Sequence, residues 1–569
     1  MAMPTSTRSG ERVSALLAEL HASPKKAERS VKAALRTDPS APDLLFAAGL
    51  IALRLGKTRE ARNQFLKSIN NGLADPAAYL NAAIASAELG EVDKALDLLD
   101  KGRSRLPAAR ELMENQIKVA LQYGRPDQAL AIADNALRTD PDDPVLLLLA
   151  GLAAEAGGDL VRARSWIEAA LAQHPDRTAL HALSRIASRT NQPDLALDAS
   201  RRALALDPAD PFSAFDLAWR EVETGDFTAA LGHFTQALAG PTLACEALRM
   251  LAELPGGPSP ADITAHADAL RASAKTRTEQ GHLELARYHA AKSDSTADPL
   301  PHLAAANHLY ARDRPYDTTG DRRWHQTILS AFDRADAPAL TAAALPRPIF
   351  ILGMIRTGTT LLDRLLSATP GTASMGEVAL TDRFFRRALA SPDVPPDLAT
   401  LARDYAALQA LAGPAQTTID KMPANYMYLG WLPRAFPGCR IILMERDRRD
   451  VAASAFESFF DMAAMNFTFR EDWLAQKLDL YDQHIAAWEA RGIDMLRVSY
   501  ERLVTDPQAT LAEVAAWCGI GPVPDPDTAA QPASIRTASF AQARQPVGTG
   551  SIGRWRRLAP LLPKICIPD

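Results

Sequence analysis

The sequence predicts a multidomain protein in which an all-α solenoid is followed by an α/β domain with a parallel sheet. Small residues recur at a constant interval through the first 240 residues, which is typical of stacked helical repeats. Beyond residue 346, short apolar runs alternate with helical stretches, which indicates parallel strands joined by helices. We therefore divide the chain into a solenoid (1–240), degenerate helical repeats with a linker (241–345) and an α/β domain (346–569).

The N-terminal periodicity is carried by alanines that lie 34 residues apart, with one interval of 33. A glycine precedes most of them and suits the turn between two helices, whereas the small alanine lets paired helices approach closely. Asn191 replaces this glycine in the short repeat, and asparagine also tolerates a left-handed turn. The pattern resembles the tetratricopeptide repeat (TPR) in about seven copies, with alanines at Ala27, Ala61, Ala95, Ala129, Ala163, Ala196 and Ala230, glycines at Gly56, Gly90, Gly124, Gly158 and Gly225, and prolines at Pro39, Pro107, Pro141, Pro175 and Pro208.

A solenoid of this kind presents a long concave surface, and each repeat contacts mainly its neighbours. Two roles stay open for it. The array can be a platform for an acceptor or a partner protein, or it can be a passive scaffold that shapes or dimerises the C-terminal domain.

The repeat pattern fades between residues 241 and 345, where we expect degenerate repeats that lead into a connector. Gly281 and Ala286 echo the turn of a repeat. The remaining expectations are a loop at Leu254–Pro260, helices at Leu303–Tyr310 and Trp324–Phe332 around a polar segment at Arg312–Arg323, and a linker at Ala335–Pro348.

The α/β domain opens with a strand, a glycine loop and a helix, an architecture that places loop N–H groups and a helix N-terminus around one anion. Ile349–Leu352 is the strand, and Gly353–Thr360 is the loop. The loop is P-loop-like, but Thr359 stands where a nucleotide-binding P-loop has lysine, and Arg356 supplies the positive charge instead. The loop therefore favours a phosphate group over Mg-ATP chemistry.

Two more strands are predicted at Arg440–Glu445 and Met495–Tyr500, and a helix at Pro507–Trp517. Arg446 follows the first of these strands, and Ser454 lies eight residues further on, so the two can converge on one phosphate across a strand-to-helix turn. The alternative is a surface ion pair of Arg446 with Asp447 or Asp450.

Five motifs in order give residues 346–569 their resemblance to sulfotransferases that use 3′-phosphoadenosine 5′-phosphosulfate (PAPS). The whole chain resembles the bacterial TPR-linked sulfotransferases and, more distantly, the tyrosylprotein sulfotransferases. It departs from the family at Ile355, where proline is usual, and at Thr357, where serine is usual. The five motifs are Gly353–Thr360, Gly376-Glu377, Asp420–Asn425, Arg446–Ser454, and Ser539–Val547 with Gly553–Trp555 beyond it.

The resemblance implies a role for each motif. The loop of Arg356, Thr357, Gly358, Thr359 and Thr360 would hold the 5′-phosphosulfate, and Arg446 with Ser454 the 3′-phosphate; Arg554 would assist there. Glu377 would be the general base, Lys421 and Arg356 would stabilise charge, and Ser539 would hold the sulfuryl-phosphate end. From the residues alone, Glu377 can instead be a capping or surface glutamate, Lys421 a solvated lysine and Ser539 a turn serine. Tyr500 would line the adenine, and a core tyrosine is the alternative.

Composition excludes several other classes. The net charge of −5, from 63 basic and 68 acidic residues, argues against a dedicated nucleic-acid binder. Four scattered cysteines indicate neither a disulfide framework nor a zinc site, and no metal is expected. No apolar run is long enough for a membrane helix and the start has no signal-peptide core, so we expect a cytoplasmic protein.

The predicted function is transfer of a sulfuryl group from PAPS to an acceptor hydroxyl on a peptide, a glycan or a small molecule. Two alternatives remain. A P-loop kinase or NTPase would use Ile441–Glu445 as its metal-binding strand, and a TPR adaptor would carry a C-terminal domain that has lost activity.

Overall fold

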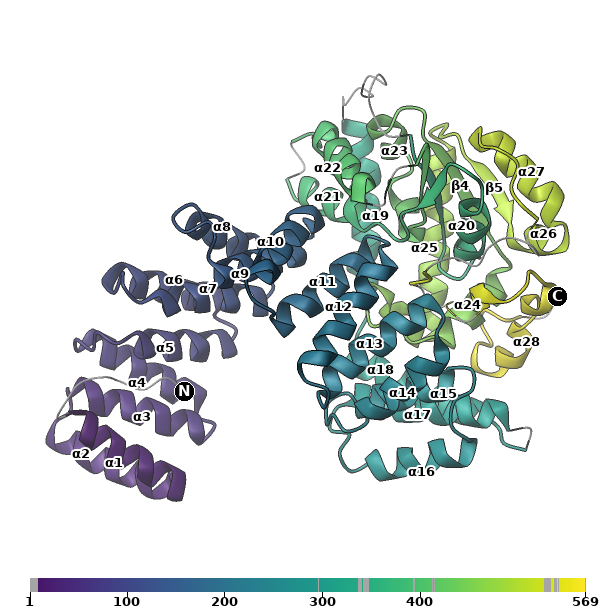
Figure 1. Ribbon diagram of the computed structural model, residues 1–569. Coiled ribbons are helices and arrows are strands. Elements are labelled where there is room, and N and C mark those ends of the chain that lie inside the picture. The colour runs from purple at the N-terminus through teal and green to yellow at the C-terminus, as the bar shows by residue number, and fades with distance from the viewer. Residues whose placement is uncertain are drawn as a thin grey trace. The chain divides into compact units, whose positions relative to one another are not determined.

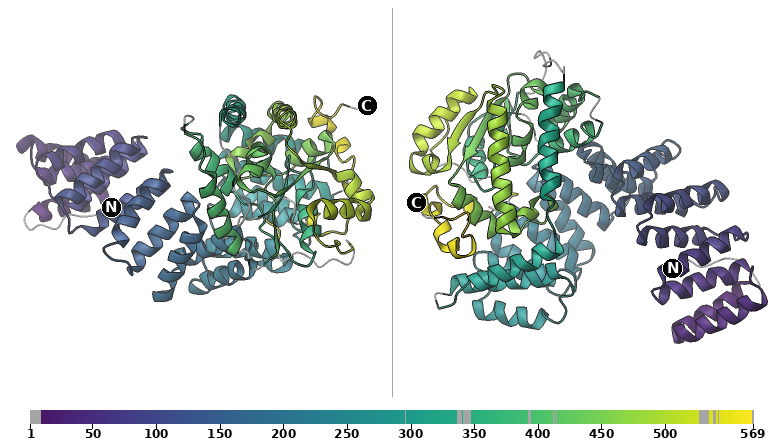
Figure 2. Two further views of the ribbon diagram at one scale, coloured as in Figure 1. Left: turned by 90° about the horizontal axis from the view of Figure 1, so that it is seen from above. Right: turned by 180° about the vertical axis from the view of Figure 1, so that it is seen from behind.

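The computed structural model describes residues 9–294, 296–335, 340, 347–391, 394–411, 413, 415–525, 534–536, 540 and 542–567. By contacts the chain forms two compact units, Met1–Pro175 and Asp176–Asp569, and each is described by itself (Figures 1 and 2). The boundary between the two units, at Pro175, lies within the repeat region rather than at its end.

The first unit consists of helices that pack in successive pairs. The turns within pairs place Gly56, Gly90, Gly124 and Gly158 at φ 73°, 81°, 70° and 80°. The repeat alanines of this unit are buried in its core. The repeat prediction is confirmed by helices α1 (Ser9–Ala22), α2 (Pro24–Thr37), α3 (Pro42–Arg54), α4 (Thr58–Asn70), α5 (Pro76–Glu88), α6 (Val92–Arg105), α7 (Arg110–Gln122), α8 (Pro126–Leu137), α9 (Pro144–Gly157) and α10 (Leu160–Gln173).

The second unit begins with the last regular repeats. Asn191 has φ 54° and Gly225 has φ 89°, so both predicted turns are left-handed. Further helices follow without the repeat marks. The helices of this part are α11 (Arg177–Arg189), α12 (Pro193–Leu206), α13 (Pro211–Thr224), α14 (Phe227–Ala237), α15 (Ala244–Glu253), α16 (Pro260–Leu270), α17 (Arg277–Ser293), α18 (Leu300–Asp313) and α19 (Thr318–Arg334).

One expectation for the region after residue 240 is wrong. Gly281 is not a turn but lies inside α17, where a Cβ atom would come within 2.4 Å of the Tyr310 ring. It is small because two helices cross there, not because the chain turns. The two predicted helices extend into the polar segment Arg312–Arg323, since α18 ends at Asp313 and α19 begins at Thr318.

A five-stranded parallel sheet organises the rest of the second unit, in the order β2-β3-β1-β4-β5. The three predicted strands are confirmed. The sequence did not indicate the two short strands on one side of β1. The strands are β1 (Ile349–Gly353), β2 (Thr372–Ser374), β3 (Thr417–Asp420), β4 (Arg440–Glu445) and β5 (Leu496–Ser499).

Helices cover both faces of this sheet (Figures 1 and 2). Side chains alternate along β1, so Phe350 and Leu352 pack with α19, α21 to α23 and α25, whereas Ile349 and Ile351 pack with α20, α26 and α27. The helices that follow β1 along the chain are α20 (Thr359–Ser367), α21 (Leu380–Ala388), α22 (Leu398–Leu411), α23 (Trp431–Ala435), α24 (Arg448–Phe456), α25 (Glu471–Glu489), α26 (Tyr500–Thr505), α27 (Pro507–Cys518) and α28 (Trp555–Leu558).

Helix α19 belongs to this sheet core, although its sequence reads as part of the connector. Phe332 of α19 contacts the rings of Trp431 and Trp488 at centroid distances of 5.2 and 5.0 Å. Only Ala335, Leu340, Arg347 and Pro348 of the predicted linker are described. The fold class, an all-α TPR region followed by an α/β domain, is confirmed.

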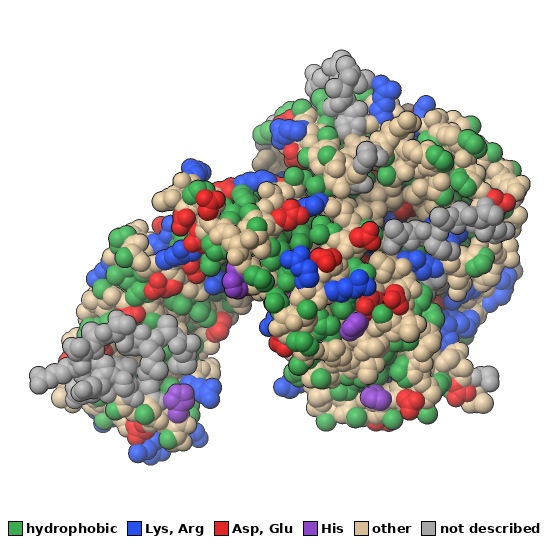
Figure 3. Space-filling model, viewed as in Figure 1, with side chains coloured by type: hydrophobic (Ala, Val, Ile, Leu, Met, Phe, Trp, Pro, Cys, Tyr) green, Lys and Arg blue, Asp and Glu red, His purple; other side chains and the backbone are tan. Residues whose placement is uncertain are grey.

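The described helices include none long and apolar enough to cross a membrane. Basic and acidic side chains are interspersed over much of the face shown in Figure 3. That distribution agrees with the nearly balanced charge of the chain.

Candidate active site

The predicted site residues follow the carboxyl ends of the strands, which is where open α/β sheets bind ligands. The glycine loop follows β1, Glu377 follows β2 by a short turn, Lys421 follows β3, and Arg446 follows β4. The strand order reverses between β1 and β4. The loop after β1 and Arg446 after β4 therefore flank the switch point of the sheet.

The conformation of the glycine loop depends on two close approaches. Gly353, at φ 149°, would place a Cβ 2.6 Å from the carbonyl oxygen of Met444 in the neighbouring strand. Gly358, at φ 97°, would place one 2.5 Å from Cδ2 of Tyr500. Gly358 is also the N-cap of α20 and provides no side chain to cap the first-turn N–H groups. The loop thus leaves a helix N-terminus open to an anion.

Arg356 takes the strained position in this loop, with φ 67°. Its Nε donates to Oγ of Ser454 at 2.8 Å, and its Nη2 donates to Oε1 of Gln542 at 3.0 Å. Burial and the neighbouring guanidinium of Arg446 lower the pKa of Arg356 to about 10. The structure therefore brings Arg356, Ser454 and Arg446 together, although they are far apart in the sequence.

Arg446 is oriented by backbone oxygens rather than by carboxylates. Its Nη1 donates to the carbonyl of Arg356 at 3.0 Å and its Nη2 to that of Ser551 at 2.6 Å. The guanidinium stacks 4.4 Å from the ring centre of Tyr500. Among the described residues, its buried Nε has no hydrogen-bond partner. An arginine fixed in this way keeps one donor for an incoming ligand.

The two aspartates proposed as alternative partners of Arg446 are engaged elsewhere. Asp447 pairs with Arg449 at 2.8 Å. Asp450 is buried and accepts the backbone N–H groups of Gly553 and Trp555 at 2.7 and 2.9 Å. Asp450 thereby holds the C-terminal segment that carries Arg554 against α24.

Arg554 lies near a second cluster of charge centred on Glu457, one turn beyond Ser454. Its Nη2 is 3.7 Å from Glu457, and Arg557 donates to the same carboxylate at 2.8 Å. Burial alone would raise the pKa of Glu457, but Lys292, Tyr288 and Arg557 outweigh it and hold the pKa at about 2. The cations at this end of the site therefore outnumber the carboxylate that they share.

Glu377 and Lys421 form an ion pair, with Nζ of Lys421 donating to Oε1 of Glu377 at 2.5 Å. The Lys421 side chain is 3% exposed, so it is not a solvated surface lysine. The Glu377 side chain remains 28% exposed, which leaves its carboxylate accessible. The N-cap residue of the next helix, α21, is Ala379, so Glu377 is not its capping residue.

Two aspartates with raised pKa values lie beside this pair. Burial raises the pKa of Asp363 to about 6, although Lys421 opposes the shift. Burial raises the pKa of Asp420 to about 8, although a backbone N–H of Val378 opposes it. Acidic groups with displaced pKa values are common near catalytic centres.

Comparisons with known proteins bear on this geometry. Residues 348–525 match the model of the sulfotransferase family, and residues 21–70, 46–110 and 120–186 match models of the tetratricopeptide repeat. The chain contains a sulfotransferase domain joined to TPR repeats. The sulfotransferase match spans the strands and most of the site residues described above.

Similar proteins cover only parts of the chain. A protein of Aquifex aeolicus (strain VF5) described as uncharacterized is 26% identical over 282 residues, which are 45% of this chain and 36% of that relative. The chain therefore spans well under half the length of this relative. The solved structure of PilF from Pseudomonas aeruginosa is 19% identical, with a TM-score of 0.29, over 36% of this chain and 93% of its own. A TPR protein from Parabacteroides merdae is 17% identical, with a TM-score of 0.35, over 42% and 99%.

Of three further predicted site residues, Tyr500 and Thr357 are described and both contact the loop. Ser539 lies outside the described residues. Tyr500 is buried beneath Gly358 and Arg446, so its established contacts are with the loop. The loop residue Thr357 donates to the carbonyl of Met354 at 2.7 Å, which braces the loop itself.

Sequence reasoning missed three residues that support the site. They are Asp363, Asp450 and Gln542, which act through hydrogen bonds to Ser374, to backbone N–H groups and to Arg356. Both Asp450 and Gln542 lie inside motifs named above, Asp450 only as an alternative partner of Arg446 and Gln542 without a role. Asp363, a carboxylate on the first helix after the loop, had no distinguishing signal.

The alternative of a metal-dependent NTPase finds no support at the end of β4. Glu445, its candidate metal ligand, is an ion-pair partner of Arg497 on β5. Within the described part of the chain no group of three or more His, Cys, Asp or Glu residues is arranged to hold a metal ion. The Glu445 carboxylate is already neutralised by the Arg497 guanidinium.

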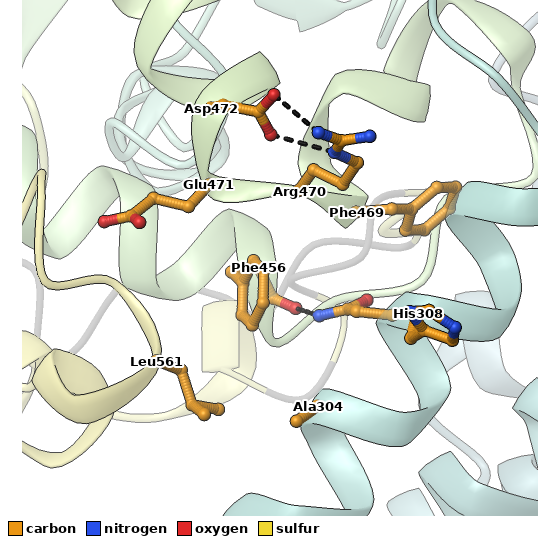
Figure 4. A pocket seen from close by; sticks show the side chains of 9 residues that line it. Ala304, His308, Phe456, Phe469, Arg470, Glu471, Asp472 and Leu561 are labelled. Atoms are coloured by element: carbon orange, nitrogen blue, oxygen red, sulfur yellow. Dashed lines mark hydrogen bonds and ion pairs between the residues drawn. The ribbon is translucent and has the colours of Figure 1, made fainter.

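A separate pocket of about 290 Å³ lies between α18, the end of α24 and the start of α25 (Figure 4). Its polar groups are paired with each other. Asn307 donates to the carbonyl of Phe456 at 2.8 Å, and Arg470 pairs with Asp472 at 2.7 Å. None of the predicted site residues lines it, so the sulfotransferase chemistry is not assigned there.

Proposed function

We propose that the protein transfers a sulfuryl group from PAPS to an acceptor hydroxyl. The observation that carries the proposal is the placement of two functional groups at adjacent strand ends of one sheet. The first group is a pair of arginines, Arg356 within the glycine loop after β1 and Arg446 after β4. The second is the Glu377–Lys421 ion pair, which follows β2 and β3.

The residues present fit a donor with two phosphate-type groups. The pKa of Arg356 is lowered by burial and by Arg446, so an anion between the two guanidinium groups would relieve both effects. The buried Nε of Arg446 has no partner among the described residues and would gain one. We assign Arg446 and Ser454, with Arg554, to the 3′-phosphate, and residues Arg356–Thr360 to the 5′-phosphosulfate.

PAPS, when bound, supplies a sulfuryl group on a phosphate leaving group. Glu377 accepts the proton of the acceptor hydroxyl as its oxygen forms a bond to sulfur. The bond between sulfur and the 5′-phosphate oxygen breaks at the same centre, and that oxygen keeps the electron pair. Arg356 and the loop N–H groups stabilise the charge that develops there, and Lys421 holds Glu377 in place. Ser539 stays a prediction for the same end of the donor, and Tyr500 stays one for the adenine.

We propose that no metal takes part, since arginines and loop N–H groups can stabilise a single phosphate leaving group. The TPR repeats would then be a platform for the acceptor or a protein partner. The acceptor would be a peptide, a glycan or a small molecule that presents a hydroxyl.

The test is transfer of label from sulfur-35 PAPS to lysate fractions, comparing the unaltered protein with Glu377→Gln. The amide keeps the shape but cannot take the proton, so turnover should fall about 10²- to 10⁴-fold. Calorimetry should show normal affinity for 3′-phosphoadenosine 5′-phosphate (PAP). Glu513→Gln is the matched control, because Glu513 forms an exposed ion pair with Arg502.

Two results would oppose this assignment. Normal turnover in Glu377→Gln would move the base to another residue. Magnesium-dependent ATP hydrolysis without PAP binding would favour the NTPase alternative for the whole domain.

A further inference from the structure

The turn between α11 and α12 contacts the catalytic sheet directly. Asn191 occupies this turn at φ 54°, where five of the other six repeats have a glycine. Its Nδ2 donates to the carbonyl oxygen of Ser374 at 2.6 Å. The exception in the repeat pattern therefore supplies a donor that glycine lacks.

Ser374 is the last residue of β2, which is at the edge of the sheet and, within the described residues, pairs with β3 alone. Its Oγ donates to Oδ2 of Asp363 at 3.0 Å and accepts the N–H of Gly376 at 3.0 Å. The carbonyl of Gly376 then accepts the N–H of Lys421 at 2.9 Å. Each of these bonds fixes the turn that carries Glu377.

The next repeat turn holds the other end of the site. The carbonyl of Glu223 accepts the N–H of Ile535 at 2.8 Å and Nη2 of Arg544 at 2.6 Å. A Cβ on Gly225 would lie 2.7 Å from the Arg544 guanidinium, so glycine is needed for this approach. The same segment provides Gln542, which binds Arg356.

We propose that the turns at Asn191 and at Glu223–Gly225 are positioning elements of the catalytic site, with Asn191 directing Glu377 through Ser374. The inference rests on the proposed function, because it takes Glu377 as the base. A short edge strand with one neighbour has little to fix its end. The repeat turn supplies the missing constraint, and a small displacement of a catalytic group is costly in rate.

Asn191→Gly tests the proposal, since glycine keeps the left-handed turn and removes only the donor. Turnover should fall about 10- to 100-fold, while PAP affinity stays within about twofold, because the arginine site is not touched. Hydrogen exchange gives a readout without activity. The amides of residues 375–377 should exchange about tenfold faster once the bond is lost.

Two further variants serve as controls. Asn191→Asp keeps the size and tolerates the same turn, but it presents a carboxylate to the Ser374 carbonyl, so it should show at least the same loss. This variant also decides the question if the glycine variant does not fold. Gly124→Asn places asparagine at the matching turn of another repeat and should change neither exchange at 375–377 nor turnover.

A double-mutant cycle connects Asn191 with Glu377. If Asn191 acts through Glu377, adding Asn191→Gly to Glu377→Gln should cause no further loss of turnover. Additive losses, or unchanged exchange at 375–377 in both Asn191 variants, would overturn the inference. A normal rate in Glu377→Gln alone would instead refute the proposed base, so the two failures are distinguishable.

Discussion

Arg446→Ala removes a guanidinium whose buried Nε has no hydrogen-bond partner among the residues that the structure describes. A charge-assisted hydrogen bond contributes about 1.5–3 kcal/mol, and each 1.4 kcal/mol corresponds to about tenfold in affinity. Arg446→Ala should therefore weaken PAP binding about 10- to 150-fold. Adenosine 5′-phosphate lacks the 3′-phosphate, so its affinity should change far less.

Isothermal calorimetry with both nucleotides measures this difference. The matched control is Arg448→Ala, which removes the same charge two residues away, where the guanidinium pairs with Asp479 and Asp482. Arg446 also donates to the carbonyls of Arg356 and Ser551, so a modest loss for both nucleotides is expected from a looser loop. Equal losses for the two ligands, or an equal effect of Arg448→Ala, would refute the assignment to the 3′-phosphate.

The remaining predictions concern stability and the loop. Because burial raises the pKa of Asp420 to about 8, the native state retains a proton that the unfolded chain releases near pH 4. The free energy of unfolding should fall as pH rises from about 4 to about 8. In urea titrations at pH 5 and 8, Asp420→Asn should reduce this difference in unfolding free energy. An unchanged difference in the variant would contradict the prediction. Gly358→Ala should abolish measurable PAP binding, because its Cβ would lie 2.5 Å from Tyr500. The control Gly492→Ala, at a position with positive φ of 72° and open space around it, should bind PAP normally. Equal PAP binding by the two variants would oppose the steric argument.

The sequence predicts those parts of the fold that have a strong local signal. The repeat turns follow from glycine and alanine at a fixed spacing, and β1 and β4 follow from apolar runs buried on both faces. The two short strands β2 and β3 were missed, because a run such as Thr372–Ser374 has neither the length nor the apolar character of a buried strand. Lys421, which follows β3, was nevertheless singled out from its motif, and its role as a charge stabiliser stays a prediction.

Other features depend on contacts that a linear pattern does not contain. Asn191 was interpreted as a residue that merely tolerates a left-handed turn, and its bond to Ser374 joins positions 183 residues apart. Gly281 carries the same residue type as a repeat turn but serves a helix crossing. A glycine required for space and a glycine required for a turn look alike until the neighbouring element is known.

Helix α19 packs into the core of the sulfotransferase domain, although it precedes the first strand of the sheet. Phe332 packs on Trp431 and Trp488, and a Cβ on Gly430 would lie 2.8 Å from its ring. A chain that starts after α19 would expose these aromatic surfaces to water, and burial of a phenylalanine side chain alone contributes about 1.5–3 kcal/mol. Asn191 and Glu223 extend these contacts to the repeat turns, since both bind segments that carry candidate site residues. The last repeats thus contact the segments on which candidate site residues lie, and they belong to the framework around the candidate site.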